Sequence, residues 1–356
     1  MAARRAAGTG TGVGNSVVDV LLERRRAGSR PGSRTDPHRV ALAIEGGGMR
    51  GIVSGAMMVA LNDMGLTAGL DAVYAFSAGA LNGAYFVTGA SWEALACYYD
   101  HLIEPGFFDP RRVLRREPVM SLDFVIDEIM ERRNPLDFQA VLDAGLKLHV
   151  TVSSIPDIKA RTISEFASKE DLKTVLRATA CLPVVGGPPV PYHGDLLLDG
   201  GVLLSHPVLT AIEDGASHIV VFRTKPEGSR RDDVGPVEQY AARRLEKMRS
   251  GLGKAFLEAQ RDQERVQAIL DPATPPAPGQ AYQLLDVVCP AGSHKVGRFT
   301  RDRGILFDGI RAGYGAMVRC VEGRAADVYL RPVLREPPWL PAQRPGDEPR
   351  ATPTTV

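Results

Sequence analysis

The sequence has few cysteines, no long uncharged apolar run and almost no net charge. Its four cysteines are scattered over 356 residues and form no C-x-x-C pair. This argues against a disulfide framework or a zinc site and favours free thiols in a reducing compartment. No uncharged apolar run approaches the roughly 18 residues that a membrane-spanning helix needs, and the arginine-rich start lacks the apolar stretch of a secretory signal. We therefore expect a cytoplasmic protein whose membrane contact is at most peripheral.

The small net charge is unevenly placed. The formal net charge is +1, although residues 1–40 carry eight arginines against three acids, so the rest of the chain is mildly acidic. A nucleic-acid-binding domain would show a basic patch together with a recognisable binding module. The sequence has no such combination, and we expect no nucleic-acid partner.

The composition divides the chain into one domain and two tails. With 44% hydrophobic residues the chain can bury a full core. Residues 1–37 are rich in Gly, Ala, Ser and Arg and are predicted to be disordered apart from a short amphipathic helix in 15–26. Residues 335–356 are proline-rich and are predicted to be an unstructured tail. The domain is therefore expected over 38–334.

Short apolar runs alternate with helical patterns along this domain. Strands are predicted at 39–44, 71–76, 147–154, 160–166, 195–199, 218–222 and 282–288. Helices are predicted after Gly51, from Ala78, at 170–180, from Pro207, at 305–322, and as one long polar helix over 236–270. This alternation predicts an α/β fold of three layers, with a mostly parallel central sheet flanked by helices. Functional groups of such folds lie at the carboxyl ends of the strands.

The first predicted strand ends in three glycines, Gly46, Gly47 and Gly48. Bare backbone just before a helix presents N–H groups, and the helix dipole adds positive potential, which suits a phosphate or a developing oxyanion. Gly46, Gly48 and Gly51 also match the G-x-G-x-x-G pattern of dinucleotide-binding proteins, with Asp71 near the expected distance. A tight turn that allows close helix–strand packing is the structural alternative.

The second predicted strand ends in "AFSAG", residues 75–79. Ser77 follows a strand and precedes a helix, as in a nucleophile elbow, which normally reads G-x-S-x-G because bulk beside the serine would clash in the sharp turn. Gly79 fits this pattern, and Ala75 is the smallest departure from it. The alternative is a serine that only caps the helix.

The third predicted strand ends in Asp199, followed by Gly200 and Gly201. This places a carboxylate at a strand terminus with an unobstructed turn behind it, although an ordinary Asp-Gly-Gly turn would look the same. Together the three strand ends supply complementary parts. A serine nucleophile needs a base, which a carboxylate can be. The tetrahedral intermediate needs backbone donors, each worth about 3 to 4 kcal/mol, and the glycine loop predicts such an oxyanion hole.

With these motifs in this order, the sequence resembles the patatin-like phospholipase family. That family carries G-G-G-x-R/K-G, then G-x-S-x-G, then D-G-G or D-G-A, which appear here at 46–51, 75–79 and 199–201. The stretch "RATACLPVVGGPPVPYHGDLLLDGG" also looks like the family's approach to its aspartate. The resemblance covers residues 38–225 well and 280–322 loosely.

The resemblance implies a lipid acyl hydrolase of the phospholipase A or lysophospholipase type that works through an acyl-enzyme. Ser77 would be the nucleophile and Asp199 the proton acceptor of a catalytic dyad without histidine. The loop residues that would form the oxyanion hole are Gly46, Gly47, Gly48, Met49, Arg50 and Gly51. The elbow and turn residues would be Ala75, Gly79, Gly200 and Gly201. A lipid ester is the implied substrate, and neither a metal nor an organic cofactor is implied.

Other readings of the same residues stay open. His206, His218 and His294 follow Asp199, and the order Ser, Asp, His is that of α/β-hydrolases, so a triad esterase is the main mechanistic rival. A lipid transacylase would share every residue of the dyad. A non-catalytic lipid- or nucleotide-binding module on the same scaffold is the alternative from another class of protein.

The segment "EPGFFDPRRVLRREP" bears on substrate access. Phe107 and Phe108 come just before Arg111 and Arg112, and aromatic side chains beside clustered arginines suit an interface with anionic lipid. These four residues are therefore predicted to face lipid, in a lid or a membrane-docking edge. Two core phenylalanines beside a solvated basic surface are the structural alternative, and the basic N-terminal helix is a competing membrane contact.

Overall fold

The apolar runs fold into one eight-stranded sheet in the computed structural model, which describes residues 15–229, 235–271 and 281–323. The strand order is β5-β6-β3-β2-β1-β7-β8, with β4 paired to β3 outside this path. The strands are β1 (Val40–Ile44), β2 (Ala72–Ala75), β3 (Lys147–Ser154), β4 (Lys159–Ile163), β5 (Val190–Tyr192), β6 (Asp195–Asp199), β7 (His218–Phe222) and β8 (Gln283–Val287). Strands β3, β2, β1, β7 and β8 run parallel to one another. Strands β4 and β6 pair antiparallel with β3, and β5 pairs antiparallel with β6.

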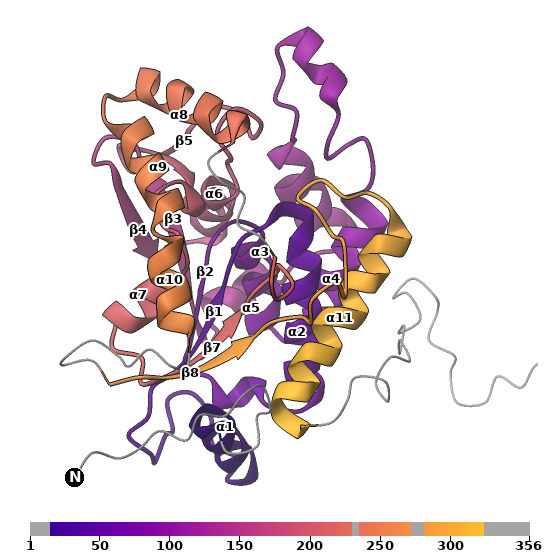
Figure 1. Cartoon of the computed structure of the whole chain (residues 1–356), viewed down its shortest axis with the longest axis vertical. Coiled ribbons are helices and arrows are strands. Elements are labelled where there is room, and N and C mark those ends of the chain that lie inside the picture. The colour runs from indigo at the N-terminus through magenta and orange to yellow at the C-terminus, as the bar shows by residue number, and fades with distance from the viewer. Residues whose placement is uncertain (1–14, 230–234, 272–280, 324–356) are drawn as a thin grey trace, which may run out of the picture.

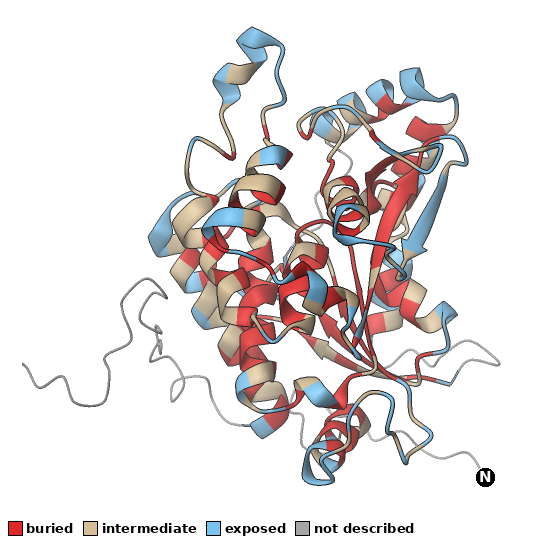
Figure 2. Ribbon diagram, turned by 180° about the vertical axis from the view of Figure 1, so that it is seen from behind, coloured by how far each residue is buried: buried red, intermediate tan, exposed pale blue. Residues whose placement is uncertain are grey.

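Helices cover both faces of the sheet, as Figure 1 shows. They are α1 (Ser16–Arg26), α2 (Gly51–Asp63), α3 (Ser77–Val87), α4 (Ser91–Ala96), α5 (Phe138–Leu142), α6 (Lys169–Thr179), α7 (Val208–Glu213), α8 (Pro236–Met248), α9 (Leu252–Arg261), α10 (Gln263–Leu270) and α11 (Arg303–Glu322). Alternate residues of β1 face opposite sides: Leu42 and Ile44 join the core under α2 and α3, whereas Ala41 and Ala43 join the core under α7 and α10. The predicted three-layer α/β class is confirmed, and burial is concentrated along the sheet (Figure 2).

Strand β3 is longer than its neighbours, and this length positions the site. The last residue of β2, Ala75, lies opposite Val150, and β3 then continues for four more residues to Ser154. Strand β6 runs back along this overhang, with Asp199 opposite Val152. Asp199 therefore reaches the end of β2 from the opposite direction, on an antiparallel strand.

The prediction of a single long polar helix over 236–270 is wrong. The segment forms the three helices α8, α9 and α10. Gly251 adopts φ +90°, a left-handed conformation that breaks the helical path between α8 and α9. The sequence on both sides of Gly251 has helical periodicity, so the pattern alone did not indicate the break. The predicted proline-rich tail, residues 335–356, lies outside the described residues.

The N-terminal segment differs from the disorder expected for residues 1–37, because residues 15–37 pack against the body. Val17, Val18 and Leu21 of α1 are fully or almost fully buried. Arg24, 2% exposed, pairs with Asp36 at 2.7 Å and Asp71 at 2.8 Å. The apolar face of this helix is covered by the protein itself, which removes it as a competing membrane contact.

Among the described residues, no helix combines the length and the apolar character that crossing a bilayer requires.

Replacing Arg24 by alanine should lower the free energy of unfolding by about 3 kcal/mol, because two carboxylates lose their buried partner. Urea denaturation would measure the change. Arg26→Ala is the matched control, since Arg26 lies in the same last turn of α1 and is exposed. Equal stability of the two variants would contradict the structural role of Arg24.

Candidate active site

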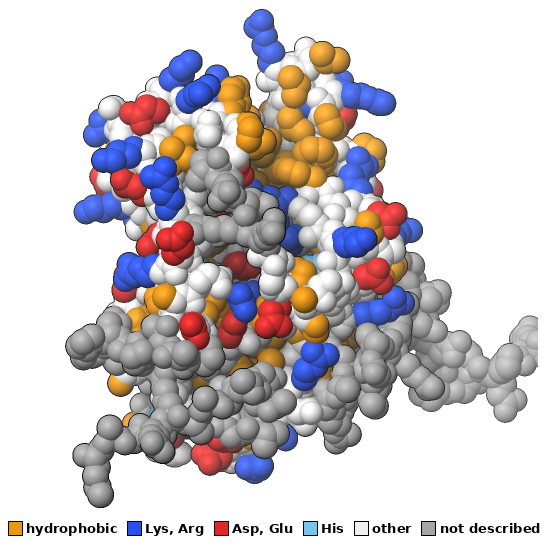
Figure 3. Space-filling view, viewed as in Figure 1, with side chains coloured by type: hydrophobic (Ala, Val, Ile, Leu, Met, Phe, Trp, Pro, Cys, Tyr) orange, Lys and Arg blue, Asp and Glu red, His pale blue; other side chains and the backbone are white. Residues whose placement is uncertain are grey.

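The three predicted motifs meet in one cavity of about 570 Å³. Gly46, Gly47 and Gly48 line it together with Ser77 and Asp199. The space-filling view shows a hollow between two lobes at the upper end of the molecule, with hydrophobic side chains on both of its sides (Figure 3). The sequence-distant strand ends therefore form a single site.

Ser77 sits in a strained turn between β2 and α3. Its φ is +53°, a conformation that L side chains rarely adopt and that persists only where the surroundings enforce it. Its backbone N–H donates to Oγ1 of Thr179 at 2.9 Å. Phe76 is the N-cap residue of α3, and no side chain caps this helix end. The Ser77 hydroxyl is therefore not a helix cap, which removes the capping alternative.

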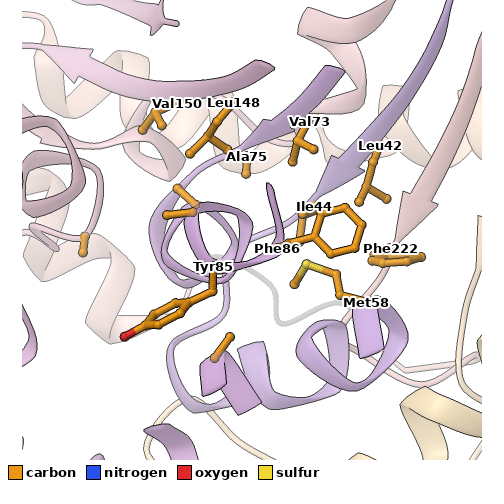
Figure 4. Close-up of a cluster of buried hydrophobic side chains, with 14 of the residues drawn as sticks. Leu42, Ile44, Met58, Val73, Ala75, Tyr85, Phe86, Leu148, Val150 and Phe222 are labelled. Carbon is orange, nitrogen blue, oxygen red and sulfur yellow. The ribbon is translucent and has the colours of Figure 1, made fainter. Parts of the chain in front are cut away.

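The two outer positions of the elbow have different packing demands. A Cβ on Gly79 would lie 2.7 Å from the carbonyl oxygen of Ile44 and 2.8 Å from that of Glu45, so only glycine allows α3 to approach β1 this closely. Ala75 is fully buried in the apolar core between the sheet and its helices (Figure 4). Its methyl group fills core space, which explains why alanine is accommodated where the family pattern has glycine.

Asp199 is 1% exposed at the end of β6. Its Oδ1 accepts a hydrogen bond from the Gly201 N–H at 2.8 Å, and its Oδ2 has no hydrogen-bond partner among the described residues. Burial raises the pKa of this carboxyl to about 6, an effect that the Ser77 hydroxyl, the Gly201 N–H and the charge of Arg298 offset in part. Asp199 is thus ionised at neutral pH but more basic than an ordinary aspartate.

The glycine loop has free donors at its start and occupied donors at its end. Among the described residues, the N–H groups of Gly46, Gly47 and Gly48 donate no hydrogen bond. The next three N–H groups are occupied: Met49 donates to the Arg298 carbonyl at 3.0 Å, Arg50 to the Gly47 carbonyl at 3.1 Å, and Gly51 to the Gly48 carbonyl. Of the six loop residues predicted to form the oxyanion hole, Met49, Arg50 and Gly51 thus have occupied N–H groups, and the first three glycines are the ones left to donate to a ligand.

Two glycines of this loop are required by their surroundings. A Cβ on Gly46 would lie 2.8 Å from the Cβ of Ser77, so this position must be bare for the loop to reach the serine. Gly48 has φ +56°, and a Cβ there would lie 2.6 Å from the Arg298 carbonyl oxygen. In the aspartate turn, a Cβ on Gly200 would likewise lie 2.7 Å from the Cβ of Phe76.

None of the three candidate histidines is poised to deprotonate Ser77. His206 lines the cavity, but its Nδ1 accepts the Val208 N–H at 3.1 Å. His294 uses its Nδ1 in the same way with Val296 at 3.3 Å. Both rings are buried and have lowered pKa values, His206 to about 4. A neutral imidazole whose Nδ1 accepts a hydrogen bond carries its proton on Nε2. Neither nitrogen then has a free lone pair with which to take the Ser77 proton.

His218 and Asp71 lie at the wrong edge of the sheet. His218 pairs with Val40 at the start of β1, four residues and roughly 13 Å along the strand from the end that carries the glycine loop. Asp71 precedes β2 and pairs with Arg24 and Arg34. The dinucleotide-binding pattern therefore fails, because its acidic residue is far from the glycines. Among residues 15–229, 235–271 and 281–323, no three His, Cys, Asp or Glu side chains converge to hold a metal ion.

The four residues predicted to face lipid are placed differently from one another. Phe107 is buried and lines the cavity. Phe108 packs against Phe299, with 4.9 Å between the ring centroids. Arg111 is exposed, and Arg112 donates to a backbone carbonyl at 2.9 Å. The two rings thus shape the cavity and its edge, and Arg111 points to solvent.

Two residues that hold the site together were not predicted. Thr179 accepts the Ser77 N–H and is fully buried. It lies in the "RATACLP" segment, whose likeness to the family was the available signal. The Arg298 carbonyl accepts the Met49 N–H. Arg298 lies in a loop far along the chain, and no periodicity or motif marks it.

The fold and the site define an α/β protein with a serine at a strained strand-to-helix turn, beside a buried carboxylate and unpaired backbone donors. Residues 42–212 match the family model described as patatin-like phospholipase. This match includes all three motifs, and the resemblance seen in them is therefore confirmed over residues 42–212.

Two further comparisons place the chain among known proteins. The "Uncharacterized protein YjjU" of Escherichia coli (strain K12) is 29% identical over 198 residues, which are 53% of this chain and 53% of that protein. The chain thus matches about half the length of this relative. The crystal structure of VipD from Legionella pneumophila aligns with a TM-score of 0.45 and 13% identity, over 81% of this chain and 67% of that chain.

Asp199→Asn should stabilise the protein at about pH 8 by up to about 3 kcal/mol, because the variant no longer buries a carboxylate. The folded state binds the Asp199 proton more tightly than the unfolded state, so native stability falls as the pH rises from 3.8 towards about 6. Urea denaturation at about pH 4 and about pH 8 measures this effect. A gain of the same size at both pH values would contradict the burial argument.

Proposed function

We propose that the protein is a lipid acyl hydrolase that cleaves carboxylic esters with Ser77 and Asp199. The observation that carries the proposal is the strained Ser77 beside the buried Asp199 carboxylate, in a cavity lined by three glycines whose N–H groups have no acceptor among the described residues. Each group answers one chemical need of acyl transfer: a nucleophile, a base and an oxyanion site. The family match to a patatin-like phospholipase supports the same reaction class.

The proposed mechanism gives each oxygen of Asp199 a separate role. Oδ1 is held by the Gly201 N–H, which leaves the unpartnered Oδ2 to accept the proton of the Ser77 hydroxyl as its oxygen attacks the ester carbonyl. The N–H groups of Gly46, Gly47 and Gly48 are the available donors to the resulting oxyanion. Collapse of the tetrahedral intermediate releases the alcohol with the proton held by Asp199 and leaves an acyl group on Ser77. The leaving alcohol takes that proton, so that Asp199 is again a carboxylate. Water, deprotonated by Asp199, then attacks the acyl-enzyme, and collapse of the second tetrahedral intermediate releases the fatty acid while Asp199 returns the proton to the Ser77 oxygen.

The cavity suits a substrate with a long apolar chain. Apolar side chains make up part of its lining, among them those of Phe107, Met120, Leu182, Val185 and Phe299. Burial of each methylene group of an acyl chain against such a wall contributes about 0.8 kcal/mol. We therefore propose long-chain lipid esters, phospholipids or lysophospholipids, as the substrate class.

Ser77→Ala and Asp199→Asn should each lower kcat/KM for a p-nitrophenyl acyl ester by at least about 10³-fold, because the two groups act as a unit. Asp195→Asn is the matched control, since Asp195 begins the same strand and does not line the cavity. His206→Gln tests the triad that shares this cavity. Loss of activity in His206→Gln with retention in Asp199→Asn would overturn the dyad.

Gly48→Ala should lower kcat by about 10²-fold or more, because it displaces donors from the oxyanion position. Gly89→Ala is the matched control: Gly89 also has positive φ, +81°, but no atom lies within 4 Å of its added Cβ. Both variants incur a similar backbone penalty, and steady-state kinetics should separate them. Equal activity of the two variants would remove the glycine loop from the mechanism.

A further inference from the structure

An arm formed by residues 105–119 projects from the body next to the cavity, at the upper right of Figure 1. Its two legs are joined at the base, where Asp109 donates its N–H to the Val119 carbonyl at 3.0 Å and Ser121 donates to the Phe107 carbonyl at 2.9 Å. Its tip is the short helix η4 (Pro110–Arg115), capped by the Asp109 side chain at the Arg111 N–H. The arm therefore has a defined conformation.

The helix at the tip buries none of its residues. Val113 is 61% exposed and Leu114 is 87% exposed. A structured element normally forms because it covers apolar surface, whereas this element presents apolar side chains to solvent. Such exposure is typical of a surface that binds something else.

Other exposed hydrophobic side chains lie at the cavity mouth. Eight large hydrophobic side chains are exposed among the described residues, and four of them line the cavity: Val184, Val237, Tyr240 and Phe299. Val237 and Tyr240 lie one turn apart on α8 and so share a face. Phe299 stacks on Phe108 at the base of the arm. Figure 3 shows hydrophobic side chains on both sides of the hollow.

The charge of the arm is complementary to an anionic surface. Residues 105–119 carry four arginines and two acids. Arg112 and Arg115 flank the Val113–Leu114 pair in the sequence, and Arg111 and Arg116 are exposed nearby. Arginine side chains beside apolar groups can lie along a bilayer surface with the guanidinium groups among phosphates. An apolar tip surrounded by cations fits lipid headgroups and acyl chains better than it fits a purely apolar protein groove.

We propose that the arm tip and the exposed side chains at the cavity mouth form one docking surface for an anionic lipid bilayer. The surface comprises Val113, Leu114, Val184, Val237, Tyr240 and Phe299, with the arginines of the arm. When this surface binds the bilayer, the cavity mouth lies against the membrane. The acyl chain of a membrane lipid then enters the cavity without crossing water. This route for the substrate rests on the proposed lipid hydrolase function; the bilayer contact itself rests on the exposed side chains.

Vesicle flotation with the full chain carrying Ser77→Ala tests the contact without hydrolysis of the lipid. We expect binding to vesicles of phosphatidylcholine with phosphatidylglycerol, weaker binding to phosphatidylcholine alone, and a decrease with salt. Val113→Ser with Leu114→Ser should weaken binding by about tenfold or more, since two apolar side chains lose their burial in lipid. Arg111→Glu with Arg115→Glu should weaken binding to the anionic vesicles alone.

Arg26→Glu with Arg30→Glu is the charge-matched control, because these exposed arginines lie in and just after α1, at the opposite end of the molecule from the arm (Figure 1). This control should bind as the Ser77→Ala parent does. Unchanged thermal unfolding of the arm variants would show that their folding is intact. Equal vesicle binding by parent and arm variants, or no binding by the parent, would overturn the docking surface. Vesicle binding by a native chain that cleaves no ester would support the surface and contradict the proposed function.

Discussion

The close approach of three backbone segments around Ser77 is the constraint on which the rest of the site depends. A Cβ at Gly46 would meet Ser77 at 2.8 Å, and one at Gly79 would meet the Ile44 carbonyl at 2.7 Å. A Cβ at Gly200, in the aspartate turn, would meet the Cβ of Phe76 at 2.7 Å. Side chains at these positions would separate the loop, the helix and the turn. The close packing of these segments therefore holds Ser77 at its strained φ.

Asp199 reaches this crowded point because β3 extends beyond β2. The overhang allows β6 to return antiparallel and to deliver Asp199 next to the end of β2. Its burial raises the pKa of the carboxyl to about 6, which makes Asp199 a better base near neutral pH while it destabilises the folded protein. Reactivity and instability thus have one cause, as is common where a functional group is desolvated.

The fold and the meeting of the motifs could be predicted from the sequence, because apolar strands, glycine runs and an Asp-Gly-Gly turn are local signals. Residues such as Arg298, whose carbonyl holds the Met49 N–H, could not be predicted, since the contact joins segments far apart in the chain. The break at Gly251 was missed because one glycine is compatible with a helix until its φ is known. The packing of α1 against the body was missed because the partners of its buried Arg24, Asp36 and Asp71, are revealed only by the fold.

The most direct measurement is the site and pH dependence of covalent labelling by a fluorophosphonate probe, read by mass spectrometry of the digested chain. We expect an adduct on Ser77. The labelling rate should rise as Asp199 ionises and reach half its maximum near pH 6. The adduct should be lost in Asp199→Asn and retained in His294→Ala. An adduct on another residue, or labelling of Ser77 that is indifferent to Asp199, would contradict the central claim that these two side chains form one catalytic unit.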